Sequence, residues 1–575
     1  MADKIFRVNM TDLSTSIEDV SADWAGHGGR GLTSTIVAAE VPPACHPLGP
    51  HNKLIFAPGL LSGTVAANSG RLSCGSKSPL TGTIKECNSG GTAAQKLAKM
   101  GCKALIIEGQ PEDDSWYSLS LTPEGVKITK EEELIGKGNF AVLESVEKRF
   151  SDKIGVISIG QGGEMLMRAA NISVKDPDSH VRSLGRGGLG AVMGSKKIKF
   201  IALDAGDRKV EIDDMDAFRA ANKVFSKALV SHPVSKALAT YGSNVLVNLI
   251  NEAGGLPTKN FTTGQFDGHE QISGETMHDL IVERGGKPKH GCHPGCVIKC
   301  SQIYNDLKGN YLTSGFEYES IWAMGADCTV DDLDKIAEMD HIMDDIGIDS
   351  IETAVAFGVA MEGGVLEFGD SNEMIRILTE EIAKGTALGR VIGNGAGSVG
   401  KTYGVTRVPV VKNQAIPAYD PRAIKGIGIT YATSTQGADH TIGYTIATEI
   451  LGVGGTIDPL SKEGQVELSR NLQIATAAID STGMCLFIAF AALDDGACLP
   501  ALVDMLNARF GINLTTDDVT SLGMTILKTE HAFNMAAGFT NLDDRLPEFF
   551  ELEPIAPHNV VWDFSGEEID AFWDF

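Results

Sequence analysis

The sequence predicts an α+β protein in which a β-rich N-terminal part is followed by two mainly helical parts. In the first ~200 residues, short apolar runs of strand length are separated by glycines. Beyond about residue 210, apolar residues recur at spacings of three and four, the pattern of a helix with one buried face. No long low-complexity linker separates these parts. We therefore expect three tightly packed domains, at 1–206, 207–412 and 413–575.

The β-rich part contains four apolar runs that we predict as strands, and four Gly-Gly pairs close to them. The predicted strands are Leu54–Ala57, Ala104–Glu108, Ile154–Ile159 and Ile198–Leu203. The pairs begin at Gly28, Gly90, Gly162 and Gly187. Any one pair is explained by a turn, but glycines also let backbone N–H groups face an anion. With Arg71 and Arg182 in the same segment, the four pairs favour a phosphate-bearing cofactor.

The helical parts contain seven segments with helical periodicity. These are 213–229, 331–344, 351–367, 371–384, 462–478, 499–510 and 515–537. We expect Asp331 and Ser371 to cap the N-termini of their helices, because aspartate and serine accept from the free N–H groups of a first turn.

The composition is that of a globular protein and excludes several partners. The 575 residues are 43% hydrophobic and 22% charged, with a formal charge of −26, so nucleic acid and anionic membranes are poor partners. The longest apolar run of the last third, 483–493, is about half of a membrane span. The N-terminus lacks the pattern of a signal peptide, so we expect a cytoplasmic protein without a membrane span. In a reducing compartment its ten cysteines are free thiols or metal ligands.

The most specific local signal is a run of three cysteines, Cys292, Cys296 and Cys300, on a turn made by Pro294 and Gly295. A [4Fe-4S] cluster takes four cysteines, so a distant fourth ligand is needed. Zinc is less suitable, because its four-cysteine sites usually consist of two Cys-x2-Cys pairs and no second pair is present. The spacing also differs from the Cys-x3-Cys-x2-Cys of radical enzymes that use S-adenosylmethionine. The run predicts an iron–sulfur cluster.

A short motif occurs twice in the helical parts. Residues 344–349 and 480–485 both read Asp-x-x-Gly, followed by an apolar residue and then Asp349 or Cys485. A match this short also arises by chance. Two copies in two domains suit a cofactor with two similar halves.

Together, several segments identify a resemblance. They are Ser78–Gly82, Asn88–Gly91, Gly185–Lys196, Glu317–Ser320, Ile416–Arg422 and the two Asp-x-x-Gly motifs. Through these segments, up to about Leu546, the chain resembles the large catalytic subunit of the tungsten-dependent aldehyde ferredoxin oxidoreductase family. The number and order of the segments make the match specific.

The resemblance implies a fold and a set of cofactors. The N-terminal domain is expected to form a saddle of β-sheet, and a tungsten bis-molybdopterin is expected between it and the two helical domains. The same pterin dithiolenes also hold molybdenum. A Mg²⁺ ion is expected to bridge the pterin phosphates. By resemblance, the residues that contact these groups are Arg71, Asn88, Arg182, Ser183, Asp344, Gly347, Asp349, Asp480 and Gly483.

The resemblance also supplies the fourth cluster ligand, Cys485, at the end of the second motif. Cys498 is its rival. The other five cysteines are expected to be small buried hydrophobic residues. One difference lies in the first cysteine spacing, which is three residues here and two in the best-known members.

For proton chemistry the resemblance points to Glu319 and His440, with Glu317 as a neighbour. An aldehyde carbonyl has to be polarised and attacked by water or by a metal-bound oxygen, and a histidine donor and a carboxylate meet those needs. Without the motif, His440 reads as an ordinary core histidine. Glu338 and His341 share a helix face and resemble half of a subunit-bridging metal site, but a solvated helix face is the preferred interpretation.

The expected activity is oxidation of an aldehyde to a carboxylic acid, with electrons leaving through the cluster to ferredoxin or a ferredoxin-like subunit. Lys287, Lys289 and Lys299 are expected to form a basic docking patch. A homodimer or a hetero-oligomer is expected. The alternatives are a tungsten subunit that reduces an acyl or aromatic CoA thioester, and a pterin-free electron-transfer subunit. The acidic aromatic tail, 561–575, differs from the ending that bacterial and archaeal aldehyde enzymes usually have; we expect it either to alter the substrate channel or to dock a partner subunit.

Overall fold

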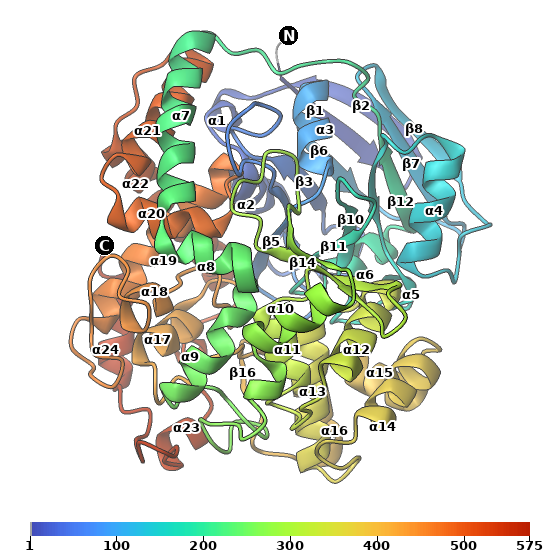
Figure 1. The fold of residues 1–575 in the computed structure, drawn as a ribbon. Helices are drawn as coiled ribbons and strands as arrows, with labels where there is room; N and C mark the ends of the chain where they lie inside the picture. Colours follow the sequence, from blue (N-terminus) through green and yellow to red (C-terminus); the bar gives the residue numbers. More distant parts are fainter. Residues whose placement is uncertain (1–2) are drawn as a thin grey trace.

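The computed structural model describes residues 3–575, and its N-terminal part consists of two six-stranded sheets (Figure 1). The first sheet has the order β2-β1-β6-β3-β4-β5, and the second has the order β11-β10-β9-β12-β7-β8. The strands of the first sheet are β1 (Lys4–Asn9), β2 (Ser14–Asp19), β3 (Leu54–Pro58), β4 (Leu72–Lys77), β5 (Ile84–Ser89) and β6 (Cys102–Glu108). Those of the second are β7 (Tyr117–Thr122), β8 (Gly125–Lys130), β9 (Gly155–Ser158), β10 (Ile172–Lys175), β11 (Val181–Leu184) and β12 (Ile198–Leu203). All four predicted strands are confirmed, with ends within two residues of those expected.

The two sheets contact each other through both pairs of edge strands, β2 with β8 and β5 with β11; the β5–β11 junction is the one next to the predicted cofactor residues. Strands β5 and β11 are mostly buried, because the helical parts of the chain cover this junction. Arg71 precedes β4, Asn88 lies near the end of β5, and Arg182 and Ser183 lie on β11. The junction therefore gathers the predicted cofactor residues of the N-terminal part, and the α+β prediction is confirmed.

The remainder of the chain is mainly helical, and three of its helices correspond to predicted segments of the middle third. Helices α7 (Met215–Ser231), α12 (Leu333–Ile346) and α13 (Ser350–Glu362) are observed. The segment predicted at 371–384 is divided into α14 (Ser371–Arg376) and a π-helical turn (Ile377–Ile382). Both predicted N-caps are wrong by one residue. Asp332 accepts from the N–H groups of residues 334 and 335, and Asp370 accepts from that of residue 373.

The C-terminal third contains α17 (Lys425–Thr433), α19 (Gln465–Thr482), α21 (Cys498–Phe510) and α22 (Thr516–Ala536). Helix α7, although distant in sequence, lies alongside α21, as the green and red-orange helices of Figure 1 show. The extended apolar contact between α7 and α21 includes Phe218, Phe225, Leu502 and Met505, all of them fully buried or nearly so. The two helical parts thus share a hydrophobic core.

The two Asp-x-x-Gly motifs occupy equivalent places in the fold. Gly347 and Gly483 end α12 and α19 in the left-handed conformation, with φ of 74° and 82°. Each glycine lies directly against a glycine of the N-terminal part, Gly160 in the first case and Gly59 in the second. A Cβ at either position would overlap the facing backbone, so glycine is required for close approach.

A buried ion pair ties the first sheet to the C-terminal helices. Arg30, on α2 (Gly29–Glu40), donates from Nε and Nη2 to the two carboxylate oxygens of Glu530 on α22, at 2.9 and 2.8 Å. Both side chains are fully buried, and Ser34 and Thr435 donate further hydrogen bonds to the same carboxylate. A buried charge pair persists only when it is satisfied in this way. The pair fixes α2 beneath the second motif, because Arg30 also lies 3.4 Å from Asp480.

The acidic aromatic tail folds back onto the C-terminal helices. Trp562 packs against Gly428 of α17, and Trp573 stacks on His531 of α22 with ring centroids 3.9 Å apart. Arg470 of α19 donates to the carbonyl oxygens of residues 571 and 572. None of the described residues of the tail lines the main cavity, which argues against the expected effect on the substrate channel.

Within residues 3–575, no single helix is long and apolar enough to cross a membrane. One helix pair, Gln465–Thr482 with Leu486–Asp494, meets the length and composition criteria jointly but is bent by 120° at the break.

Candidate functional site

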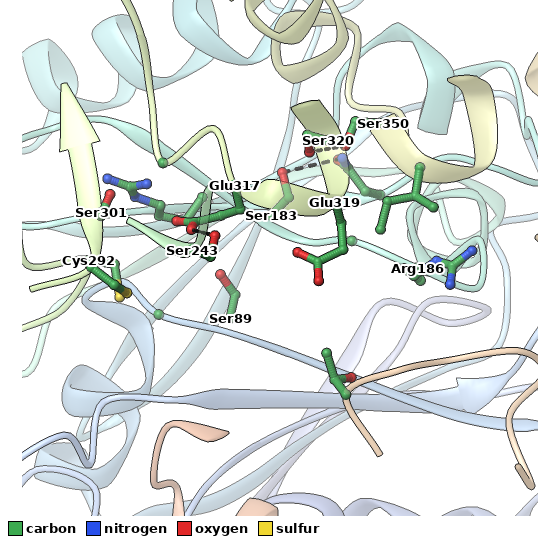
Figure 2. Close-up of a pocket in the computed structure, with 18 of the residues that line it drawn as sticks. Ser89, Ser183, Arg186, Ser243, Cys292, Ser301, Glu317, Glu319, Ser320 and Ser350 are labelled. Carbon is green, nitrogen blue, oxygen red and sulfur yellow. Dashed lines mark hydrogen bonds between the residues drawn. The ribbon is translucent and has the colours of Figure 1, made fainter. Parts of the chain in front are cut away.

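A cavity of about 320 Å³ lies at the junction of the β5 and β11 edges with the helical parts. Figure 2 shows Cys292 at one side, Arg186 at the other, and Glu319 between them. Most of the residues predicted for the cluster, the cofactor and the proton chemistry line this one cavity. They are Arg71, Arg182, Ser183, Cys292, Cys300, Glu319, Asp344, Asp349, His440 and Cys485.

The four predicted cluster ligands come together at one end of the cavity. Cys292, Cys300 and Cys485 line it, and the thiol of Cys296 contacts that of Cys292. A single zinc ion would bring its sulfur ligands to within roughly 4 Å of one another, given Zn–S bonds of about 2.3 Å. No three of these thiols lie within 4.8 Å of one another; over residues 3–575, only a different trio of potential ligands does so. This spacing is wider than one four-coordinate zinc ion requires, and the [4Fe-4S] cluster stays a prediction.

Asn68 joins the two loops that carry the cysteines. Its N–H donates to the carbonyl oxygen of Gly295 at 3.1 Å, and its side-chain oxygen accepts from the N–H of Val297 at 2.9 Å. Its own carbonyl oxygen accepts from the N–H of Cys485 at 3.0 Å. The backbone of Asn68 is left-handed, with φ of 59°, a conformation that asparagine tolerates better than most residues. This residue, which the sequence analysis missed, is what places the fourth cysteine beside the other three.

The environment of the cysteines favours one thiolate above the others. The Cys296 thiol and, to a lesser extent, His293 and Arg182 hold the pKa of Cys292 well below its usual range, although burial acts in the opposite direction. Burial raises the pKa of Cys485 to about 11. Cys292 therefore loses its proton more easily than Cys485, and the thiolate is the form that binds a metal.

Of the other six cysteines, Cys498 and four more are buried and Cys45 is half-buried. Cys498 lies in the apolar contact between α7 and α21, outside the cavity. The structure therefore favours Cys485 over Cys498 as the residue that lies with the cysteine run.

The trio that does gather its potential ligand atoms is Asp176, His180 and His290. The positively charged side chain of Arg182 already contacts two of these three residues. Arg182 donates to Asp176 at 3.0 and 3.2 Å and to Nδ1 of His290 at 3.0 Å. A metal-bound histidine normally donates from its other ring nitrogen, which Arg182 makes impossible here. We interpret the trio as the support that holds Arg182 against the cavity.

The residues predicted for the second pterin lie partly behind the cavity wall. Asn88 donates to Asp480 at 3.2 Å, and its side-chain oxygen accepts from Nε of Arg71 at 2.7 Å. Of these three residues only Arg71 lines the cavity. The Asn88 oxygen accepts one hydrogen bond and keeps a second lone pair, so its contact with Mg²⁺ stays a prediction.

The residues predicted for the first pterin line the cavity more directly. Ser183 donates to Asp344 at 3.4 Å, and Arg186 reaches Asp349 at 3.3 Å. Arg186 also donates to the carbonyl oxygens of Ala438 and Ala415 at 2.9 and 2.7 Å, so it fixes the loop that carries His440. Arg186 was not singled out from the sequence, although it lies inside the quoted segment Gly185–Lys196.

Burial raises the pKa of both motif aspartates. Burial, reinforced by Asp340, raises the pKa of Asp344 well above its usual range. Burial raises the pKa of Asp480 to about 6, against the pull of Arg30 and Arg71. With a pKa of about 6, Asp480 is mostly ionised at pH 7 and accepts hydrogen bonds, which suits the N–H donors of a heterocycle edge.

Most of the Gly-Gly pairs serve interdomain packing. Gly28 and Gly29 lie against the backbone of residues 480 and 481, and Gly162 lies against Gly347. Of the eight glycines in the four pairs, only Gly90 lines the cavity. A Cβ there would lie 2.7 Å from the sulfur of Cys292. Three of the four pairs therefore lie outside the lining of this cavity, and the interpretation of the pairs as a phosphate site stays a prediction.

The predicted catalytic pair is in direct contact. Nε2 of His440 lies 2.9 Å from a carboxylate oxygen of Glu319, and the hydroxyl of Tyr419 donates to the same oxygen at 3.3 Å. Burial alone would raise the pKa of Glu319, but the His440 and Tyr419 contacts outweigh it and the pKa is lowered. Glu319 is therefore an ionised base, and His440 is oriented by it.

Glu317 lies closer to the cysteines than to His440. Burial raises its pKa to about 7, and the hydroxyl of Ser243 donates to it at 2.6 Å. Glu338 and His341 do not meet at a shared site, since Glu338 pairs with Lys335 at 3.3 Å and His341 stacks on Phe140.

Comparison with known proteins finds family matches over almost all of the chain. Residues 5–205 match the family described as "Aldehyde ferredoxin oxidoreductase, N-terminal domain", and residues 220–567 match "Aldehyde ferredoxin oxidoreductase, domains 2 & 3". The chain is 36% identical to the tungsten-containing aldehyde ferredoxin oxidoreductase of Pyrococcus furiosus, with 96% of this chain and 92% of that protein covered. It is 37% identical to the Thermococcus kodakarensis protein of the same name, with the same coverage.

A solved structure shares the fold at lower identity. The active-site complex BamBC of benzoyl coenzyme A reductase superposes with a TM-score of 0.80 at 17% identity, covering 99% of this chain and 93% of that one. The matches at 36% and 37% identity decide the family. The chain belongs to the aldehyde ferredoxin oxidoreductase family.

Proposed function

We propose that the protein oxidises an aldehyde to a carboxylic acid and passes the two electrons, one at a time, to ferredoxin or a ferredoxin-like subunit. The observation that carries this proposal is the Glu319–His440 pair at 2.9 Å, in the same cavity as the gathered cysteines. The reaction adds one oxygen atom from water to the aldehyde carbon and releases two electrons and two protons. Side chains of the cavity could accept the protons, and the gathered cysteines could hold the centre that accepts the electrons.

The side chains around the cavity meet the needs of the carbonyl. Since Nε2 of His440 faces Glu319, the ring nitrogen left to donate toward the carbonyl oxygen is Nδ1, which has no hydrogen-bond partner among residues 3–575. With both ring nitrogens carrying a proton, His440 would stabilise the negative charge that develops on this oxygen as water attacks. Glu319, ionised and largely buried, accepts a proton from the attacking water. Tyr419 and Tyr444, whose hydroxyl groups are 2.8 Å apart, hold Glu319 in place from the other side.

The donor set also fits the cofactors that the family implies. Asp344 and Asp480 would offer hydrogen-bond acceptors to a pterin, and Arg71, Arg182 and Arg186 would offer cations to its phosphates. Cys292, Cys296, Cys300 and Cys485 would hold the cluster. When bound, a tungsten bis-pterin and a [4Fe-4S] cluster would supply the two-electron and one-electron redox chemistry. Whether Mg²⁺ is also present stays a prediction.

The test is metal analysis of protein purified without oxygen, combined with an aldehyde panel and a viologen acceptor. We expect close to one tungsten and about four irons per chain, and viologen reduction with at least one aldehyde. Tungsten near zero would overturn the proposal. Full tungsten without oxidation of any aldehyde would instead support the thioester-reducing alternative.

The partner prediction concerns the surface around the cysteine loop. Lys287, Lys289 and Lys299 are all exposed there, next to the partly exposed Cys296. We expect charge reversal of all three lysines to slow ferredoxin reduction at low salt about tenfold or more, because complementary charges mainly raise association rates. Reduction of a small viologen should be unchanged. Unchanged ferredoxin reduction at low salt would exclude this surface as the docking site.

A further inference from the structure

The three residues between Cys292 and Cys296 form a turn that places His293 beside the predicted cluster site. The N–H of Cys296 donates to the carbonyl oxygen of His293 at 3.2 Å. Pro294 occupies the second position of this turn, and Gly295, with φ of 85°, occupies the third. Proline followed by a left-handed glycine is the signature of a type II turn. The turn leaves the exposed tip at residues 294 and 295 and directs His293 inward.

His293 is held tightly beside one of the predicted cluster ligands. Its Nδ1 lies 3.2 Å from the sulfur of Cys292, and the residue is only 2% exposed. Its ring lies against Gly70, where a Cβ would overlap the ring atoms. The absence of a side chain at Gly70 therefore creates the space that the imidazole occupies. Rotation of the ring away from Cys292 is blocked on that side.

The hydrogen-bonding roles in this contact follow from the chemistry of a metal-bound thiolate, which only accepts. The proton of the imidazole must therefore be on Nδ1. The other ring nitrogen, Nε2, is buried and has no hydrogen-bond partner. A proton on Nε2 would be an unpaired buried donor, so the geometry favours the tautomer with its proton on Nδ1.

We propose that His293 donates an N–H···S hydrogen bond to the Cys292 thiolate and thereby raises the reduction potential of the [4Fe-4S] cluster. The inference rests on the cluster assignment in the proposed function. Reduction of the cluster adds one electron, part of whose charge resides on the sulfurs. A fixed donor stabilises that reduced state more than the oxidised one, and hydrogen bonds to sulfur are a recognised determinant of cluster potentials.

The experiment is a dithionite titration of the complete enzyme with redox mediators, followed by EPR of the reduced cluster. His293→Phe keeps a ring of similar volume and removes the donor. We expect the ratio of reduced to oxidised cluster at a fixed potential to fall about tenfold, which is a shift of about 59 mV to lower potential for one electron. His293→Asn places an amide N–H near the position of Nδ1 and should retain most of the potential.

Gly70→Ala provides a second route to the same effect, since the added methyl group should push the ring away and lower the potential while His293 remains. Iron content and the EPR line shape verify that each variant still carries the cluster. A midpoint in His293→Phe equal to that of the unaltered enzyme would overturn the inference, as would equal shifts in the Phe and Asn variants. Absence of any [4Fe-4S] signal from the unaltered enzyme would instead overturn the cluster assignment itself.

Discussion

Replacement of Cys485 by alanine is expected to abolish aldehyde-dependent reduction of ferredoxin and to lower the iron content from about four atoms per chain toward zero. Cys485 is the only predicted ligand that comes from the C-terminal third, and it reaches the other three through the N–H that it donates to Asn68. Without its thiolate, one iron of the cubane lacks a protein ligand. Iron analysis and EPR of anaerobically purified protein measure the loss directly.

Cys498→Ala is the matched control for this change. Cys498 is the other candidate from the C-terminal third, but it is fully buried in the apolar contact between α7 and α21. We expect this variant to keep its cluster and its ferredoxin activity, with at most a loss of stability from the small cavity that it creates. If Cys498→Ala lost the cluster and Cys485→Ala kept it, the ligand assignment would be wrong.

The helices and strands that the sequence predicted best are those whose local pattern agrees with their packing. The segment predicted at 515–537 is observed as α22, Thr516–Ala536, where Thr515 and Asp518 form a capping box at its start. The prediction missed α2, Gly29–Glu40, because its first residues include two glycines and an arginine that face other parts of the chain. The Arg30–Glu530 pair and the contact with the second motif stabilise α2, and neither is visible in a local window.

The same distinction between local pattern and long-range contact applies to the residues of the candidate site. The cysteine run and the two Asp-x-x-Gly motifs were recognisable because their residue types and spacings carry chemistry. Asn68 and Arg186 were not, because their roles lie in long-range hydrogen bonds to loops that follow much later in the chain. Several of the glycine pairs are explained by close backbone approach. Sequence alone does not separate this use of glycine from anion binding, which stays a prediction.

The second large effect is expected at the Glu319–His440 pair. Glu319→Gln keeps the shape of the side chain and removes the base, so we expect kcat to fall by about 10²–10⁴, the usual contribution of a positioned acid or base. His440→Gln should produce a loss of similar size. The double variant should be little worse than either single variant, because two groups that act as one unit are not additive. Tungsten and iron contents should stay unchanged in all three.

Tyr419→Phe is the control for a disturbance around the pair. It removes the hydrogen bond to Glu319 at 3.3 Å and the one between the Tyr419 and Tyr444 hydroxyl groups at 2.8 Å but leaves Glu319 and His440 in place, so a loss below tenfold is expected. If Glu319→Gln also lost less than tenfold with full metal content, Glu319 would not be the base.

The pH dependence of the residual activity distinguishes a base from a residue that only supports the fold. In the unaltered enzyme the contacts with His440 and Tyr419 lower the pKa of Glu319 below 4.5, so its carboxylate is ionised through the neutral range. In His440→Gln the positive partner is gone and burial dominates, because burial disfavours the charged form of a carboxyl group. The pKa of Glu319 therefore rises, and the acid limb of the kcat/KM profile moves to higher pH. The same shift should be absent from Glu319→Gln, where no carboxyl group remains to titrate. An acid limb that moved equally in both variants would assign the titration to another group, with Glu317, whose pKa is about 7, as the first to examine.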